Sequence, residues 1–249
     1  YICPVKTYGE IIANEKQGKI SALMTIEEGG CCKGEIQNLE TLYQLGARMM
    51  TLTWNYPNEL ASPNIFDKDS LLSAKGFPIF DASVGLTERG FLFIERMEEL
   101  GMIIDVSHLS DAGFWDIAKH TKKPFVASHS NARALCGHAR NLTDDMIRVI
   151  ADRGGVIGLN CYGRFLNAVN DDSSSVARLA EHARHILNVG GGECLALGTD
   201  FDGMNGRLEM QDCSQIYKLV RELEHKHFTD NEIENILSQN VMRVYKELL

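Results

Sequence analysis

The stretch MIIDVSH, residues 102–108, shows the pattern that decides the fold. Its first six residues are mostly apolar, as in a strand buried on both faces of a parallel sheet, and it ends in a histidine. The stretch PFVASH, residues 124–129, repeats this arrangement, and a segment with helical spacing, Ser110–His120, lies between the two. Strand, helix and strand in this order predict a βαβ unit.

Similar apolar runs recur along the chain, and segments of helical spacing alternate with them. We expect strands at Ile20–Ile26, Arg48–Thr53, Met102–Ser107, Pro124–Ser128, Gly155–Asn160 and Cys194–Thr199. We expect helices at Ile36–Leu45, Glu88–Leu100, Ser110–His120, Asp144–Asp152, Val176–Val189, Asp212–His227, Asp230–Ser238 and Asn240–Leu249. Residues suited to begin or end these helices lie at the expected places, namely Ser110, Thr143, Gly46, Gly101 and Gly154.

The number and spacing of the strands indicate the fold class. Their spacing fits the roughly 31 residues per unit of a (β/α)8 barrel of this length, but six strands cannot close a barrel without exposed edges. We therefore expect an α/β fold: a single TIM-like (β/α)8 barrel domain over residues 1–249 that is incomplete, with its N-terminal strands missing. The chain begins with Tyr1 and not with Met, which agrees with this expectation. The irregular stretch Asn55–Thr87 is interpreted as an insertion above a strand.

Composition and charge exclude several classes of protein. Of 249 residues, 44% are hydrophobic and 24% are charged, which is typical of a globular protein. The net charge of −9 argues against binding of nucleic acid, and no apolar run reaches the roughly 18–20 residues that cross a membrane. Seven cysteines without a C-x-x-C pair favour free thiols in a reducing compartment, so we expect a cytoplasmic protein.

Chemically competent side chains follow the expected strands, at the end that forms the active-site face of a barrel. These residues are Glu27, Trp54, His108, His129, Asn160 and Asp200. His108 and His129 follow strands one βα unit apart, so their imidazoles could share a divalent transition metal. The alternative is that both are ordinary polar residues at strand ends.

Carboxylates and an arginine could complete such a site. Glu27 and Glu28 could bind one metal or bridge two, although an exposed acidic turn would have the same sequence. Asp200 could orient a water molecule and move its proton, whereas Asp202, before Gly203, fits an ordinary turn. Arg140 could hold a substrate carboxylate, or it could be a surface arginine. The sequence has no G-x-S-x-G elbow, P-loop or strand-linked G-x-G-x-x-G.

Taken together, these motifs resemble those of the membrane (renal-type) dipeptidases, the M19 metallopeptidases, including their soluble bacterial members. The resemblance is carried by IEEGG (26–30), LYQLG (42–46) with the strand that ends in Leu52 and Thr53, IDVSH (104–108), SHS (128–130), ARNL (139–142) and GTDFDG (198–203). Each motif alone is weak, but their order and spacing together are specific to the family.

The resemblance implies a zinc-dependent dipeptidase that hydrolyses small dipeptides through a metal-bound hydroxide at a binuclear zinc site. It implies that His108 and His129 bind one zinc and that Glu27 bridges both ions, with Glu28 in this role if the register slips by one. It implies that Asp200 handles the proton of the water and of the leaving amine. Arg140 would bind the carboxylate of the dipeptide, and we place Trp54 and Tyr162 with it as substrate-binding residues.

Two departures from the family pattern keep other functions open. Residues Tyr1–Lys19 hold no His-x-Asp pair, which completes the second metal site in the family, so this chain would bind one zinc or none. Trp54 stands where better-known members have a histidine that contacts the substrate carbonyl, and an indole cannot carry a positive charge. The alternatives are a catalytically silent truncated barrel and another binuclear amidohydrolase acting on a cyclic amide or lactone. The expected partner is a dipeptide, without nucleic acid or membrane, and related enzymes are commonly homodimers.

Overall fold

The structure is a computed structural model that describes residues 1–64, 83–167 and 171–249. The chain divides into two compact units, Tyr1–Phe125 with Met242–Leu249 and Val126–Val241, and each is described here by itself. The single domain expected from the sequence therefore stays a prediction. Much of the irregular stretch expected over Asn55–Thr87 lies outside the described residues.

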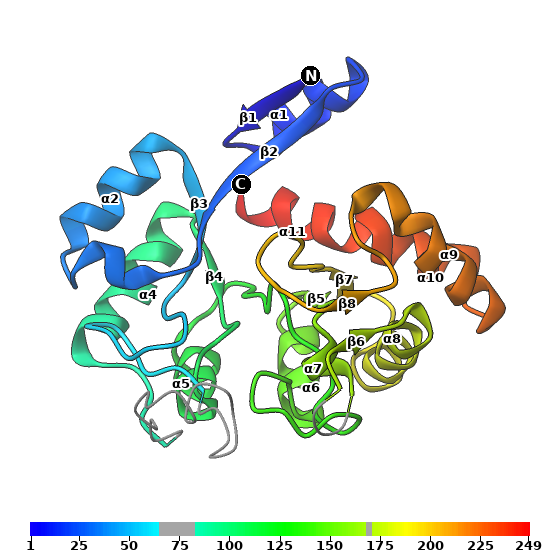
Figure 1. The fold of residues 1–249 in the computed structure, drawn as a ribbon. Coiled ribbons are helices and arrows are strands. Elements are labelled where there is room, and N and C mark those ends of the chain that lie inside the picture. The colour runs from blue at the N-terminus through cyan, green and yellow to red at the C-terminus, as the bar shows by residue number, and fades with distance from the viewer. Residues whose placement is uncertain (65–82, 168–170) are drawn as a thin grey trace. The chain divides into compact units, whose positions relative to one another are not determined.

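The first unit is built around a four-stranded parallel sheet (Figure 1). Its strands follow the sequence order: β1 (Ile2–Val5), β2 (Ile20–Ile26), β3 (Ala47–Thr51) and β4 (Ile103–Asp105). The helices are α1 (Tyr8–Lys16), α2 (Ile36–Leu45), α4 (Glu88–Leu100) and α5 (Asp111–His120). Helices α2 and α4 pack against each other and against β3 and β4, as the crossovers of successive βαβ units do.

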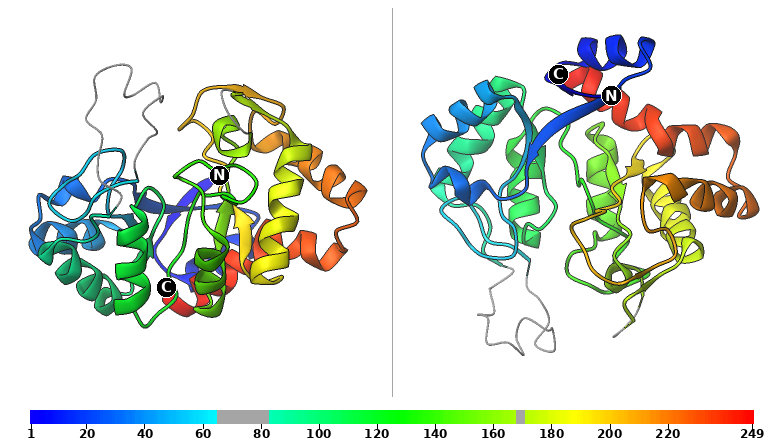
Figure 2. Two further views of the ribbon diagram at one scale, coloured as in Figure 1. Left: turned by 90° about the horizontal axis from the view of Figure 1, so that it is seen from below. Right: turned by 45° about the horizontal axis from the view of Figure 1, so that its top comes forward.

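Strand β1 corrects the expected set of strands, as do the two-residue strands Ser173–Ser174 and Arg207–Leu208 of the second unit, because the sequence pattern did not predict them. Strand β1 pairs only with the first half of β2, from Ile20 to Leu23, while Met24–Ile26 of β2 pair with β3. Ile2 and Ile20 remain exposed, and β2, which was expected to be buried on both faces, has no fully buried residue. Figure 2 shows β1 and α1 at the amino end of β2, the end opposite Glu27.

The second unit has shorter parallel pairings. Strand β5 (Ile157–Leu159) pairs with β7 (Leu195–Leu197), and β6 (Ser173–Ser174) pairs with β8 (Arg207–Leu208). The strand expected at Pro124–Ser128 is present only as a single parallel bridge from Ala127 to Ile157. This backbone nevertheless continues the ladder, since the Gly158 N–H donates to the Ala127 carbonyl and the Ser130 N–H to the Gly158 carbonyl, both at 2.8 Å.

The helices of this unit are α6 (Asp144–Asp152), α7 (Gly163–Leu166), α8 (Val176–Gly190), α9 (Ile216–His225) and α10 (Asp230–Glu234) (Figures 1 and 2). Helix α11 (Asn240–Leu248) begins in this unit, but its residues from Met242 onward belong to the first unit. Helix α8 packs against β5 and β7 on one side and against α6 and α9 on others. A 3-10 turn (η2, Cys213–Gln215) precedes α9, and a π turn (η3, Asn235–Gln239) follows α10, within segments expected to be continuous helix.

The helix ends agree closely with the sequence signals. The Ser110 hydroxyl accepts the Gly113 N–H, and the Thr143 hydroxyl accepts the Met146 N–H, as predicted for N-caps. Gly46 and Gly101 cap the ends of α2 and α4 at positive φ.

The strand pairings confirm the α/β class but not the closed barrel. All named strands in the described part of the chain pair in parallel, and they form three separate sheets. The TIM-like barrel and its missing strands stay predictions. Among the described residues, every helix is too short or too polar to span a bilayer.

Candidate active site

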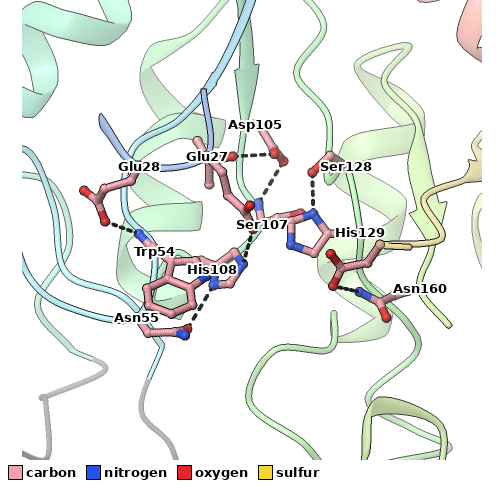
Figure 3. A network of polar contacts seen from close by, with 12 residues as sticks. Glu27, Glu28, Trp54, Asn55, Asp105, Ser107, His108, Ser128, His129 and Asn160 are labelled. Atoms are coloured by element: carbon pink, nitrogen blue, oxygen red, sulfur yellow. Dashed lines mark hydrogen bonds and ion pairs between the residues drawn. The ribbon is translucent and has the colours of Figure 1, made fainter. Parts of the chain in front are cut away.

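In the first unit, Glu27 and His108 lie at the carboxyl ends of β2 and β4 and point toward each other (Figure 3). Glu27 Oε1 is 3.2 Å from His108 Nε2, and the His108 ring is buried while Glu27 is half exposed. Two ligands of a tetrahedral zinc, each about 2.0–2.1 Å from the ion, are about 3.3 Å apart. The imidazole and the carboxylate are therefore of the right kind and at a suitable separation to bind one metal, although the distance also suits a direct hydrogen bond.

The backbone turn after β4 fixes the position of His108. His108 has a φ of +70°, which is strained for a residue with a side chain. The buried Asp105 holds this turn, because its carboxylate accepts the Ser107 N–H at 3.0 Å and the Thr51 hydroxyl at 2.6 Å. Strain that is maintained by buried hydrogen bonds is characteristic of functional positions.

Asn55 fixes the orientation of the His108 ring (Figure 3). Its Oδ1 atom is 3.1 Å from His108 Nδ1, and an amide oxygen can only accept, so Nδ1 carries the proton. In the neutral ring Nε2 is then the atom that can bind a metal. Asn55 and Asp105 were not recognised from the sequence, although Asp105, inside an otherwise apolar run, is a detectable signal.

Glu28 has a different environment from Glu27. Its Oε1 accepts the Gly30 N–H at 2.7 Å and the Asn58 side-chain amide at 2.6 Å, and its Oε2 accepts the Trp54 N–H at 2.8 Å. These bonds join the turn after β2 to the loop after β3. In the first unit it is Glu27, and not Glu28, that contacts His108.

Trp54 lies beside His108 and is 43% exposed. Its ring centroid is 6.4 Å from that of His108 and 6.0 Å from that of Tyr56, with tilted planes. The indole therefore places an apolar surface next to a candidate metal ligand, where a substrate side chain could contact it.

In the second unit, His129 follows the bridge residue Ala127 and is buried. The Ser128 hydroxyl lies 2.7 Å from His129 Nδ1, which orients the ring (Figure 3). Two glycines pack against this segment: a Cβ atom at Gly158 or at Gly198 would collide with the Ser128 carbonyl oxygen. Close packing of the backbone at these glycines brings the ends of β5 and β7 close to the segment that carries His129.

Asp200 follows β7 and adopts a φ of +61°. The side-chain amide of Asn160, the residue after β5, donates to Asp200 Oδ2 at 3.3 Å. The Gly203 N–H donates to the Asp200 carbonyl at 3.1 Å, and Asp202 has a φ of +69°, which matches the turn role expected for Asp202. Asp200 thus lies at the end of a strand, next to a buried amide.

Arg140 is buried and is therefore not a surface arginine. Its guanidinium lies over the ring of Phe165, 5.3 Å from the centroid, and the Tyr162 ring packs edge-on against the same ring at 4.9 Å. Phe165, in α7, thus joins two of the expected substrate-binding residues. No feature of the sequence marks Phe165 as part of a site, because a phenylalanine in a short helix is usually part of the core.

The cysteines behave as the sequence indicated, since all seven are free. Cys161, next to Asn160, is buried, and this burial, followed by the negative charge of Asp200, raises the pKa of its thiol to about 12. The thiol is therefore neutral at physiological pH, a form in which it is a poor nucleophile.

Several solved structures share this fold. A metallopeptidase from Rhodobacter sphaeroides, liganded with a phosphinate mimic of the dipeptide L-Ala-D-Ala, matches with a TM-score of 0.88 and 23% identity over 100% of this chain and 69% of that one. A probable dipeptidase from Pseudomonas aeruginosa matches with a TM-score of 0.86 and 20% identity over 99% of this chain and 74% of that one. At these identities the likeness shows a shared fold.

Sequence comparison gives the family. An uncharacterized protein of Klebsiella pneumoniae is 35% identical over 236 residues, 94% of this chain and 84% of that protein. An uncharacterized dipeptidase of Schizosaccharomyces pombe is 33% identical over 239 residues, 95% of this chain but only 55% of that protein. The model of the membrane dipeptidase family, peptidase family M19, matches residues 2–248, and the chain belongs to this family, as its motifs predicted.

Proposed function

We propose that this protein is a metal-dependent dipeptidase that hydrolyses the peptide bond of small dipeptides. The observation that carries the proposal is the pair of Glu27 and His108, 3.2 Å apart at the carboxyl ends of two parallel strands, within a chain of the M19 family. A related fold has been solved with a dipeptide mimic, which supports the same class of substrate. We further propose that the chain forms most of a TIM-like barrel domain.

The proposed metal is zinc, and its proposed ligands are Glu27, His108 and His129. Imidazole nitrogen and carboxylate oxygen are donors that zinc binds readily, and these three residues are of the kinds that could hold an ion. Asn55 and Ser128 would orient the two rings. When bound, zinc would polarise the peptide carbonyl and make water more acidic. In the intact family site Glu27 would bridge two ions.

The remaining steps belong to side chains of the protein. Asp200 would accept a proton from the attacking water at a carboxylate oxygen and return it to the leaving amine. Arg140 would bind the C-terminal carboxylate of the dipeptide, because a buried guanidinium beside Phe165 binds a carboxylate strongly. Tyr162 and Trp54 would contact the substrate next to these groups.

Replacement of Asp200 tests this function directly. Asp200→Asn keeps the shape of the side chain but removes the base, so we expect dipeptide turnover to fall by about 10²–10⁴-fold. Metal content per chain, measured by plasma mass spectrometry, should not change. Asp202→Asn, two residues away in the same turn, is the matched control and should keep its activity. Full activity of Asp200→Asn would contradict the proposed role.

A catalytically silent chain with an incomplete metal site is the second candidate. It is favoured by residues Tyr1–Lys19, which contain neither histidine nor aspartate. Metal analysis of the zinc-loaded protein distinguishes the two, because two bound ions per chain would refute the incomplete site. Hydrolysis of a cyclic amide or lactone in preference to a dipeptide would instead favour the amidohydrolase alternative.

A further inference from the structure

The side chain of Asn160 makes two different contacts among the candidate site residues of the second unit, one of which is drawn in Figure 3. Asn160 is the residue after β5 and is completely buried. Its Nδ2 donates to Asp200 Oδ2 at 3.3 Å, and its Oδ1 accepts the Tyr162 N–H at 2.6 Å. One amide thus orients the carboxylate of Asp200 and the backbone of Tyr162.

The backbone of Asn160 is itself held by a second buried amide, that of Asn131. Asn131 Nδ2 donates to the Asn160 carbonyl at 2.9 Å, and Asn131 Oδ1 accepts the Asn160 N–H at 3.0 Å. In a regular sheet, the backbone of a neighbouring strand would make these two hydrogen bonds. Here the fully buried side chain of Asn131 makes them. Asn131 is two residues after His129, so the segment that carries His129 also positions Asn160.

The segment that carries Asn131 is in turn bound to helix α8. The N–H of Ala132, next to Asn131, donates to His182 Nδ1 at 3.1 Å, and His182 Nε2 lies 3.1 Å from the Leu166 carbonyl. His182 is completely buried. The segment with Asn131, which holds Asn160, is therefore fixed by a packed helix and not by a flexible loop.

The other side of the Asp200 carboxylate is bounded by Gly203. A Cβ atom at Gly203 would collide with Asp200 Oδ1, while Oδ2 faces the Asn160 amide. One carboxylate oxygen thus accepts a hydrogen bond and the other lies against Gly203, in a residue whose backbone is in the left-handed region.

We propose that Asn160 is a positioning residue that holds the carboxylate of Asp200 in its reactive orientation, with Asn131 fixing Asn160 in turn. The proposal rests on the proposed role of Asp200 as the group that moves protons. The bond to Tyr162 N–H alone would make Asn160 a turn residue; the bond to Asp200 gives it a role in the reaction. Asparagine is required because one side chain must both accept from Tyr162 and donate to Asp200.

Asn160→Asp separates these two functions. The substitution keeps Oδ1 for the Tyr162 N–H and leaves the hydrogen bonds with Asn131 in place, but it replaces the donor to Asp200 by an oxygen that repels it. We expect kcat for a dipeptide to fall by about 10–100-fold while KM changes less than twofold, because orientation and not binding is lost. A kcat equal to that of the wild type would overturn the proposal.

Asn240 provides a matched control for the loss of a buried amide. It is buried in the same unit, and its Nδ2 donates to the Gly192 and Leu195 carbonyls, at the amino end of β7. Asn160→Ala and Asn240→Ala should both lower the melting temperature, but only Asn160→Ala should lower kcat. An equal loss of kcat in both variants would reduce Asn160 to a structural residue and refute the proposal.

A measurement that needs no activity separates this inference from the proposed function. In the protein labelled with ¹⁵N-asparagine, Asp200→Ala removes the acceptor, so the Nδ2 proton resonances of Asn160 should move upfield while those of Asn240 stay in place. If they do not move, the contact is absent and the inference fails. If they move but the wild type hydrolyses no dipeptide, the proposed function fails and the contact stands.

Discussion

Glu27 and Glu28 are adjacent in the sequence, but their carboxylates have different surroundings. Glu27 extends to His108, whereas Glu28 accepts three hydrogen bonds from Gly30, Trp54 and Asn58. Hydrogen bonds to a charged acceptor are stronger than neutral ones and are costly to lose once their donors are desolvated. The first glutamate therefore faces the candidate metal ligand His108, while the second joins the two loops.

We predict that substitution of Glu28 changes the stability of the protein, whereas substitution of Glu27 changes its affinity for zinc. Glu28→Ala should lower the free energy of unfolding by about 1–3 kcal/mol, because three donors lose their acceptor. Glu27→Gln should leave stability nearly unchanged and weaken zinc binding by tenfold or more. Urea denaturation and a zinc titration with a competing chelator measure the two effects. Glu35→Ala, at an exposed glutamate that makes no cap bond to α2, is the control for stability. Equal zinc affinity of Glu27→Gln and the wild type would contradict the assignment.

For single residues, the sequence identified the candidate metal ligands but not the side chains that orient them. The two expected strand ends at Glu27 and His108 predicted a pair that the structure brings together. Asn55 and Asn131 could not be predicted, because a loop asparagine looks the same in sequence whether or not its amide meets a partner. Such contacts depend on loop geometry, which short-range periodicity does not encode.

Strands β5 and β7 depend on two glycines to approach their neighbours. Gly158 lies inside β5 and Gly198 directly follows β7, and a Cβ atom at either would meet the Ser128 carbonyl oxygen. Neither glycine has a positive φ, so the requirement is for space and not for an unusual backbone conformation. Any side chain there must push apart the strand ends that carry His129, Asn160 and Asp200.

We predict that Gly158→Ala destabilises the protein by about 1–3 kcal/mol or more, because the added methyl group overpacks a backbone contact. Gly192→Ala is the matched control: Gly192 is exposed, and a Cβ atom there would meet no other atom within 4 Å. This control should be neutral or slightly stabilising. Thermal unfolding followed by circular dichroism measures both. A melting temperature of Gly158→Ala equal to that of the wild type would show that the strands can separate at no cost.

At the level of elements, the sequence predicted the bounds of several helices and of β2 well, but it did not predict the strands β1, β6 and β8. The bounds expected for α2, α4 and α6 coincide with those observed, because caps and apolar spacing both mark them. Strand β1 was missed because its pairing lies at an exposed end of β2. The run at Pro124–Ser128 is buried and apolar as expected, yet its backbone forms only one bridge. Burial is encoded in composition, whereas the regularity of a ladder is decided by the neighbouring strands.

For the molecule as a whole, His182 is the group that most clearly couples stability to pH. It is completely buried in α8, and this burial is the main cause that lowers the pKa of its imidazole to about 4, from 6.5. Its Nδ1 accepts the Ala132 N–H, and a protonated ring could not do so. Protonation would therefore both place a charge in the core and break the connection from α8 to Asn131.

The sign of this effect follows from the direction of the pKa change. Between pH 6.5 and 4 the unfolded chain holds a proton on His182 that the folded chain does not, so stability rises with pH in this window. The stabilisation is complete above pH 6.5 and is lost as the pH falls, by about 3 kcal/mol at pH 4. The hydrogen bond from Arg184 lowers the pKa of the Glu232 carboxyl. The contribution of this carboxyl to the free energy of unfolding is therefore lost only as the pH falls below about 4.5.

We predict that His182→Gln removes this pH dependence. Near pH 5.5 the free energy of unfolding of the wild type should change more steeply with pH than that of the variant, by about 1.4 kcal/mol per pH unit, the value for one proton. Urea denaturation at half-unit steps from pH 4.5 to 7 measures both slopes. His225→Gln, at an exposed histidine of α9, is the control for the substitution itself. Equal slopes for the wild type and His182→Gln would show that His182 takes up its proton in the folded state as readily as in the unfolded chain. The anchor of Asn131, and through it of Asn160, would then not depend on a neutral imidazole.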